Sequence, residues 1–186
     1  MKIVLRDVLL NDREPEEWLL PDSSLHTKRL PVFLPEYAPE FEAALTVMWR
    51  VGRLGKQVAE RFVQRYWDAA TLAVVTMPVA EPLGASNVLR RAFDGAVAPG
   101  KWLSAEAFAH CVGKPVEVTL NGASRLMATD GLEGQLTALL THTSRHATLK
   151  MGDLLGVVLS ERIPVKPDDV LRGVWGEEQV FVLRYK

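Results

Sequence analysis

Residues 33–67 read FLPEYAPEFEAALTVMWRVGRLGKQVAERFVQRYW, and this stretch decides the fold. Residues 42–51 alternate between large apolar side chains and smaller or polar ones, a period of two that predicts a strand with two different faces. The large side chains on one face are Leu45, Val47, Trp49 and Val51. Gly55 then turns the chain, and the apolar spacing in residues 56–67 predicts an amphipathic helix.

Further strands are predicted on both sides of this stretch. Proline interrupts the segment at 30–34, which favours an edge position for that strand because proline cannot donate to the ladder. The other short, apolar or alternating segments lie at Lys2–Leu5, Ala70–Thr76, Asp153–Leu159, Leu171–Trp175 and Gln179–Tyr185. The chain is therefore rich in strands.

Turn and cap signals divide the remaining sequence. Asn121–Gly122 lies between two strand-like segments and predicts a tight hairpin with positive φ at both turn residues. Ser104 can cap a helix that runs to His110. Asp130, followed by Glu133, resembles a capping box that opens a helix ending near His146.

The order of these elements indicates the fold class. Many short strands, about three short helices and no βαβ rhythm predict a single α+β domain over residues 1–186, mostly β, with a mixed or antiparallel sheet curled into a roll or barrel. Residues 77–100 contain three prolines and three glycines, and they read as a loop of the kind that often carries function.

Composition excludes several function classes. The 186 residues carry a net charge of −1, so no long-range field favours nucleic acid or an acidic membrane. Cys111 is the one cysteine, which excludes an internal disulfide and fits a reduced cytoplasmic setting; it reads as a small core residue. The N-terminus lacks the layout of a signal peptide, and no segment approaches membrane-spanning length. A locally basic run, read as a solvated face, comprises Arg50, Arg53, Lys56, Arg61 and Arg65.

Several motifs occur together in a recognisable order. They are WLLPDSSL at 18–25, PVFLPEY at 31–37, RVGRLGKQVAERFVQRYWDA at 50–69, RAFDGA at 91–96 and SRHATLKMGDLL at 144–155. With these motifs the chain resembles the fumarylacetoacetate hydrolase family, in its short bacterial form. The resemblance implies a β-roll around a central pocket and a homodimer.

Active members of that family hold Mg²⁺ or Mn²⁺ with a Glu-x-Glu pair on one strand and an Asp on a later strand. Such hard cations prefer carboxylate oxygens, and alternate residues of a strand project to one side. Ungapped alignment on the RLGK motif puts the glutamate positions on Ala44 and Thr46, and the aspartate position falls on Val75. The resemblance therefore implies degenerate metal positions and no bound metal.

Four residues are pocket candidates by the same resemblance. Arg91 stands where active members often have a lysine, and it could bind a carboxylate bidentately or form a surface ion pair. His26 and Ser24 belong to the turn near the pocket mouth, and Asp94 is retained in the RAFDGA motif. Ser24 has no base at a readable spacing, so the sequence does not indicate a serine hydrolase.

Two functions stay open at this point. The first is a catalytically degenerate protein that binds a small organic acid or serves as a partner subunit. The alternative is an active metal-dependent hydrolase, decarboxylase or isomerase of a 2-oxo or β-keto acid, with Mg²⁺ or Mn²⁺ held by Glu40 and Glu42. His142 and His146 lie at i, i+4, but the sequence favours a structural or solvated pair. His110 reads as a core or boundary residue.

Overall fold

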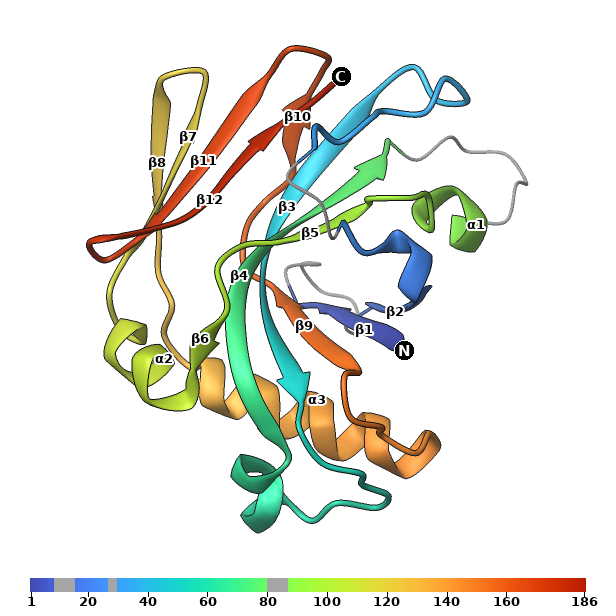
Figure 1. Cartoon of the computed structure of the whole chain (residues 1–186), viewed down its shortest axis with the longest axis vertical. Coiled ribbons are helices and arrows are strands. Elements are labelled where there is room, and N and C mark those ends of the chain that lie inside the picture. Colours follow the sequence, from blue (N-terminus) through green and yellow to red (C-terminus); the bar gives the residue numbers. More distant parts are fainter. Residues whose placement is uncertain (9–15, 27–29, 80–86) are drawn as a thin grey trace.

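The computed structural model describes residues 1–8, 16–26, 30–79 and 87–186, and most of them belong to two sheets (Figure 1). The larger sheet has the order β2-β1-β9-β3-β4-β5, with β10 paired to β3 and β6 paired to β4. Its strands are β1 (Lys2–Asp7), β2 (Glu16–Pro21), β3 (Phe41–Val51), β4 (Trp67–Pro78), β5 (Val97–Pro99), β6 (Leu103–Ser104), β9 (Leu154–Val158) and β10 (Ile163–Val165). β1 runs parallel to β9, and the other pairs are antiparallel, so the sheet is mixed.

The smaller sheet is antiparallel, with the order β12-β11-β7-β8. Its strands are β7 (Val116–Leu120), β8 (Ala123–Met127), β11 (Val170–Trp175) and β12 (Glu178–Arg184). The two sheets lie side by side in Figure 1 and, over the described strands, do not close into a barrel. The mostly β, mixed-sheet α+β fold is confirmed, in the form of an open roll.

The helices are short and lie at the ends of the sheets. They are α1 (Asn87–Arg91), α2 (Ala105–Cys111), α3 (Leu132–His146) and the 3₁₀ turns η1 (Asp22–Ser24) and η2 (Glu60–Arg65). In Figure 1, α3 crosses one end of the larger sheet and α2 lies beside it. Within the described part of the chain, no helix has both the length and the apolar character that a membrane crossing requires.

β3 supplies both faces of the larger sheet, as its alternation predicts. Its odd-numbered residues face the main core, where side chains of both sheets and of α3 meet. Phe108 of α2 contacts the rings of Trp49 and Trp175 edge-on, at centroid distances of 6.0 and 5.5 Å. These aromatic contacts join the two sheets.

The opposite face of the larger sheet is also buried, and we call its apolar layer the second core. β2 contributes Trp18 and Leu20 to it, and Ala92, which follows α1, packs against it; this layer positions the candidate site. Its buried members are Ile3, Leu5, Trp18, Leu20, Ala44, Met48, Ala73, Val75, Met77, Val97, Leu154 and Val158.

The predicted strand at residues 30–34 is wrong. Only Val32 forms an isolated parallel bridge there, to Tyr185. Pro31 and Pro35 have no N–H to donate, and they limit the pairing to the residues between them. The segment still lies beside the end of β12, which agrees with the predicted edge position.

The predicted helix at residues 56–67 is wrong in its extent, since only the 3₁₀ turn of η2 forms. The N–H of Gln57 donates to the carbonyl of Ser144, and the N–H of Val58 donates to the Ser144 hydroxyl, at 2.9 Å each. Gln57 also has a φ of 51°. These bonds to α3 hold the start of the segment outside a helical conformation.

The turn and cap predictions have mixed outcomes. The Asn121–Gly122 hairpin is confirmed, with φ values of 48° and 93°. Ser104 caps α2 as predicted, because its hydroxyl accepts from the Ala107 N–H. The capping box at Asp130 is wrong, since Gly131 with a φ of 73° precedes α3 and no side chain caps that helix.

The described parts of residues 77–100 are more ordered than a loop. They contain the end of β4, helix α1 and strand β5, while part of the segment, 80–86, lies outside the described residues. β5 pairs with β4 and helps to cover the second core.

Candidate functional site

The three residues aligned with the family's metal ligands lie together on the second-core face. Ala44 of β3 is the register partner of Val75 of β4, and Thr46 follows Ala44 on the same face. Their exposed fractions are 0% for Ala44, 0% for Thr46 and 2% for Val75. The β3–β4 pairing therefore brings together Ala44 and Val75, which are 31 positions apart. Both lie in a buried and mainly apolar layer.

These three side chains do not fit a divalent metal ion. Methyl and isopropyl groups supply no ligand atom, and the Thr46 hydroxyl is a single neutral oxygen, whereas Mg²⁺ and Ca²⁺ sites use several oxygens, carboxylates among them. The Thr46 Oγ1 is buried and has no hydrogen-bond partner among the described residues. Within the described residues, no group of three His, Cys, Asp or Glu side chains could hold a metal ion.

The alternative pair, Glu40 and Glu42, is divided between two environments. Glu42 lies within β3, opposite Met77 on one side and Pro164 on the other, and it is half-buried. Glu40 precedes the strand and is exposed, and its backbone carbonyl accepts from the Val79 N–H. Of the two carboxylates, Glu42 shares the strand face of Ala44, two residues away.

An arginine that the sequence patterns do not single out lies beside this face. β9 and β10 both pair with β3, so residues 159–162 pass next to Ala44: Val158 is opposite Thr46 and Ile163 is opposite Ala43. The Arg162 guanidinium donates through Nη2 to the Asp7 carboxylate. These two residues are 155 positions apart, and no local sequence signal relates them.

A second arginine lies over the same tryptophan as Arg162. Arg91 Nη1 donates to Glu16 Oε1 at 2.8 Å, so Arg91 does form an ion pair. The guanidinium carbon is 4.4 Å from the Trp18 ring centroid for Arg91 and 5.2 Å for Arg162. Partial burial alone would raise the pKa of Glu16, but the hydrogen bond and charge of Arg91 hold it below its ordinary value.

The Arg162 guanidinium is in a demanding electrostatic position. Burial lowers the pKa of Arg162 below its ordinary value, and the positive charge of Arg91 lowers it further. The negative charges of Asp7, Glu42 and Glu16 oppose this shift without cancelling it. Its Nη1 atom is buried and has no hydrogen-bond partner among the described residues.

The other pocket candidates have separate environments. His26 Nε2 is 2.7 Å from the Leu30 carbonyl, and His26 lines a groove of about 950 Å³ between β5 and β12, where Arg91, Ser24 and Asp94 are absent from the described lining residues. Ser24 is fully buried, and Asp94 is exposed. Of the four candidates, the described lining of this groove contains His26.

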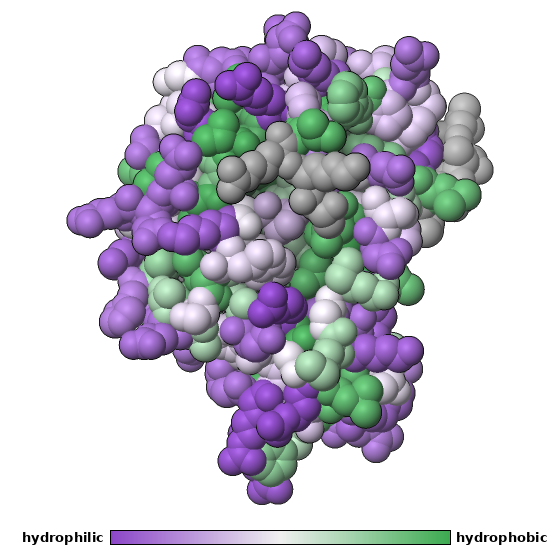
Figure 2. Space-filling model, viewed as in Figure 1, coloured by the Kyte–Doolittle hydropathy of each residue, from purple (hydrophilic) through white to green (hydrophobic). Residues whose placement is uncertain are grey.

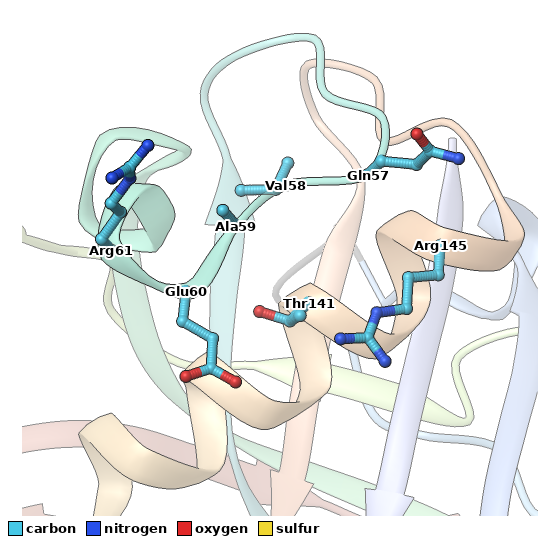
Figure 3. A pocket seen from close by; sticks show the side chains of 7 residues that line it. All are labelled: Gln57, Val58, Ala59, Glu60, Arg61, Thr141 and Arg145. Carbon is cyan, nitrogen blue, oxygen red and sulfur yellow. The ribbon is translucent and has the colours of Figure 1, made fainter.

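A separate pocket of about 760 Å³ lies between the segment before η2 and helix α3 (Figure 3). Figure 3 shows Arg145 turned toward Thr141, whereas Arg61 points away to the other side. The nearby basic run is solvated, as predicted, because Arg53, Lys56, Arg61 and Arg65 are exposed and Arg50 is half-buried. In Figure 2 the corresponding lower end of the molecule is largely hydrophilic.

The histidines of the helices are at the surface. The rings of His142 and His146 are 4.7 Å apart and both residues are exposed, which confirms the solvated pair. His142 Nε2 is 3.3 Å from a carboxylate oxygen of Glu17. His110 is exposed, so its prediction as a core or boundary residue is wrong, whereas Cys111 is buried as predicted.

Comparisons with solved structures agree with the fold. The chain superposes on a protein from Yersinia pestis CO92 ascribed to the fumarylacetoacetate hydrolase family, with a TM-score of 0.83 and 20% identity over 100% of this chain and 92% of the other. It is similar to fumarylpyruvate hydrolase from Pseudomonas aeruginosa in complex with Mn²⁺ and pyruvate, with a TM-score of 0.84 and 12% identity over 100% and 89% of the chains. It is also similar to 2-hydroxyhepta-2,4-diene-1,7-dioate isomerase from Mycobacterium marinum, with a TM-score of 0.85 and 16% identity over 99% and 73%.

Sequence comparison gives the family directly. Among curated proteins, none matches the sequence closely enough to count as a relative. The family model for the fumarylacetoacetate (FAA) hydrolase C-terminal domain matches residues 6–157, which include β3, the RLGK motif and most of the second core. The chain therefore belongs to the fumarylacetoacetate hydrolase family.

Proposed function

We propose that this chain is a catalytically degenerate member of its family, which keeps the fold without the family's metal-dependent chemistry and acts as a binding protein or partner subunit. The observation that carries this proposal is the second core. Ala44, Thr46 and Val75 are buried there, and they offer one neutral oxygen between them.

The packing of this face supports the proposal independently of the alignment. A metalloenzyme of keto acids needs carboxylate ligands and an open coordination position for the substrate oxygen. Here Trp18 of β2 belongs to the same buried layer as Ala44 and Val75, and the Arg162 guanidinium lies over its ring. Side chains of the chain itself therefore pack against the face on which Ala44 and Val75 lie.

Metal titration and turnover test the proposal together. Calorimetric titration with Mn²⁺ and with Mg²⁺ is expected to give no saturable heat, and acylpyruvates and oxaloacetate are expected to react at the uncatalysed rate in the presence of Mn²⁺. The Pseudomonas aeruginosa fumarylpyruvate hydrolase, measured in parallel, is the positive control. Stoichiometric binding with turnover, both lost in Glu40→Ala or Glu42→Ala, would instead establish the metal-dependent hydrolase, decarboxylase or isomerase.

A bound organic acid is a second proposal, and the contact between Arg91 and Glu16 favours it. The Arg91 guanidinium already donates to a carboxylate in this position, with side-chain exposed fractions of 21% for Arg91 and 45% for Glu16. A small acid would take the place of Glu16. Pyruvate affinity measured by calorimetry is therefore expected to rise in Glu16→Gln and to vanish in Arg91→Gln, and equal affinity in all forms would refute this ligand.

A homodimer is proposed on the resemblance to the family. Light scattering of the purified chain should give twice the monomer mass of 20.7 kDa. A monomeric mass across the accessible concentration range would contradict the partner-subunit part of the proposal in its homodimeric form.

A further inference from the structure

The pocket between the segment before η2 and helix α3 has side chains of both charges in its lining (Figure 3). Glu60 and Arg145 are both exposed, and in Figure 3 their charged groups lie on opposite sides of Thr141. Within the described part of the chain, no ion pair involves Glu60 or Arg145. A carboxylate and a guanidinium therefore share one pocket without pairing with each other.

Hydrogen bonds between the two walls hold this pocket in shape. The Ser144 hydroxyl accepts from the Val58 N–H, and the Ser144 carbonyl accepts from the Gln57 N–H, at 2.9 Å each. Lys56 Nζ donates to the Arg145 carbonyl in the last turn of α3, at 3.3 Å. Because these bonds fix residues 56–58 against the helix, a ligand would enter a preformed site at a low ordering cost.

A third polar group of this pocket, the Thr141 hydroxyl, is buried. Thr141 is 6% exposed, and its Oγ1 has no hydrogen-bond partner among the described residues. Thr141 and Arg145 are four residues apart on α3, so their side chains lie on one face of the helix. Figure 3 shows the Thr141 oxygen on the side of Glu60. A helical threonine has two accessible χ1 rotamers, so this unsatisfied hydroxyl can turn toward a ligand that supplies its hydrogen bond.

The charges and the apolar lining together define the class of ligand. Arg61 points away in Figure 3, so one carboxylate and one guanidinium face the pocket. A simple anion would be attracted by Arg145 and repelled by Glu60, and a simple cation would experience the reverse. Val58 and Ala59 add apolar surface to the lining. A molecule that carries an ammonium, a carboxylate and a small apolar group matches all of these features.

We propose that this pocket binds an apolar α-amino acid. Its carboxylate pairs with Arg145, its ammonium pairs with Glu60, and the Thr141 hydroxyl accepts a hydrogen bond from the ammonium. None of the described lining residues of the pocket belongs to the second core, so this inference does not depend on the proposed function.

Calorimetric titration of the purified chain with L-leucine tests the assignment, and saturable binding is expected. The affinity should fall about tenfold or more in Arg145→Gln and in Glu60→Gln, because each variant removes a charge-assisted hydrogen bond. Thr141→Val should also weaken binding, whereas Thr141→Ser keeps the hydroxyl and should bind as the wild type does. The matched controls are Arg53→Gln and Glu133→Gln, which change exposed residues outside the described lining and should leave the affinity unchanged.

Two analogues of leucine distinguish a site for both charges from a site for one. Isocaproate lacks the ammonium and isoamylamine lacks the carboxylate, so each is expected to bind about tenfold more weakly than L-leucine or worse. Isocaproate binding as tight as that of leucine, with tighter binding in Glu60→Gln, would assign the pocket to anions and overturn the proposal.

Two further results would also overturn it. They are the absence of saturable heat with millimolar L-leucine, and a leucine affinity that stays unchanged in both charge variants. Since Glu60 and Arg145 are exposed, both variants should unfold at the same temperature as the wild type, so a loss of affinity reports on the pocket and not on the fold.

Discussion

Val75→Asp restores the aspartate that the family resemblance expects on β4. This substitution tests whether position 75 belongs to an apolar core or to a polar site that water can reach. Val75 is 2% exposed, and its neighbours in the second core are apolar. Asp has nearly the volume of Val, so the cavity term is small. The lost burial of the valine side chain costs about 2 kcal/mol.

The introduced carboxyl adds a larger cost. In an apolar layer it folds in its neutral form, and protonating a group of ordinary pKa near 3.9 at pH 7 costs about 4 kcal/mol. The two contributions sum to about 6 kcal/mol, which approaches the whole stability of many domains. Because the folded-state pKa is raised, the folded chain binds more protons, and the variant recovers about 2.5 kcal/mol between pH 7 and pH 5.

Urea denaturation at pH 7 and pH 5 measures both quantities. Val182→Asp is the matched control, since Val182 lies on strand β12 and is 40% exposed. That substitution should cost about 1 kcal/mol or less, without the recovery at low pH. A cost below about 1 kcal/mol for Val75→Asp, independent of pH, would refute the reasoning, because it would mean that water already reaches this position.

Three smaller predictions concern polar contacts of single side chains, each measured by urea denaturation. Asp153→Asn replaces a carboxylate that is 1% exposed and pairs with Lys2. This change should lower the free energy of unfolding by about 3 kcal/mol at pH 7. Burial alone would raise the pKa of Asp153, but its hydrogen bonds hold it below the ordinary value of 3.8; the stabilisation is therefore present above pH 4, and the difference should shrink as the pH falls below that value. Ser144→Ala leaves the buried Val58 N–H without its acceptor and should cost about 1–3 kcal/mol. Ser104→Ala removes the cap of α2 and should cost about 1 kcal/mol.

The sequence predicts the fold correctly where local patterns and tertiary packing agree. The two-residue period of β3 gave its length and both faces, and the Asn121–Gly122 turn gave the β7–β8 hairpin, because each depends on near neighbours. The segment at 56–67 shows the opposite case. Its helical spacing is real, but hydrogen bonds to Ser144, far along the chain, hold its start in another conformation.

The residues of the candidate site could be predicted only in part, for a related reason. Aligning a motif placed Ala44, Thr46 and Val75, and the β3–β4 pairing then brought Ala44 and Val75 together. Arg162 could not be found in this way, because its partner Asp7 is at the other end of the chain and neither residue belongs to a motif. The one available signal is weak. It is a charged residue between two short apolar strands, β9 and β10, which both pair with β3.

A crystal structure from Mn²⁺-soaked crystals, with anomalous diffraction at the manganese edge, tests the central claim most directly. The account predicts no anomalous peak over Ala44, Thr46 and Val75, with the Arg162 guanidinium paired to Asp7 beside them. A manganese peak on this face, coordinated by protein oxygens at about 2.1 Å, would contradict it.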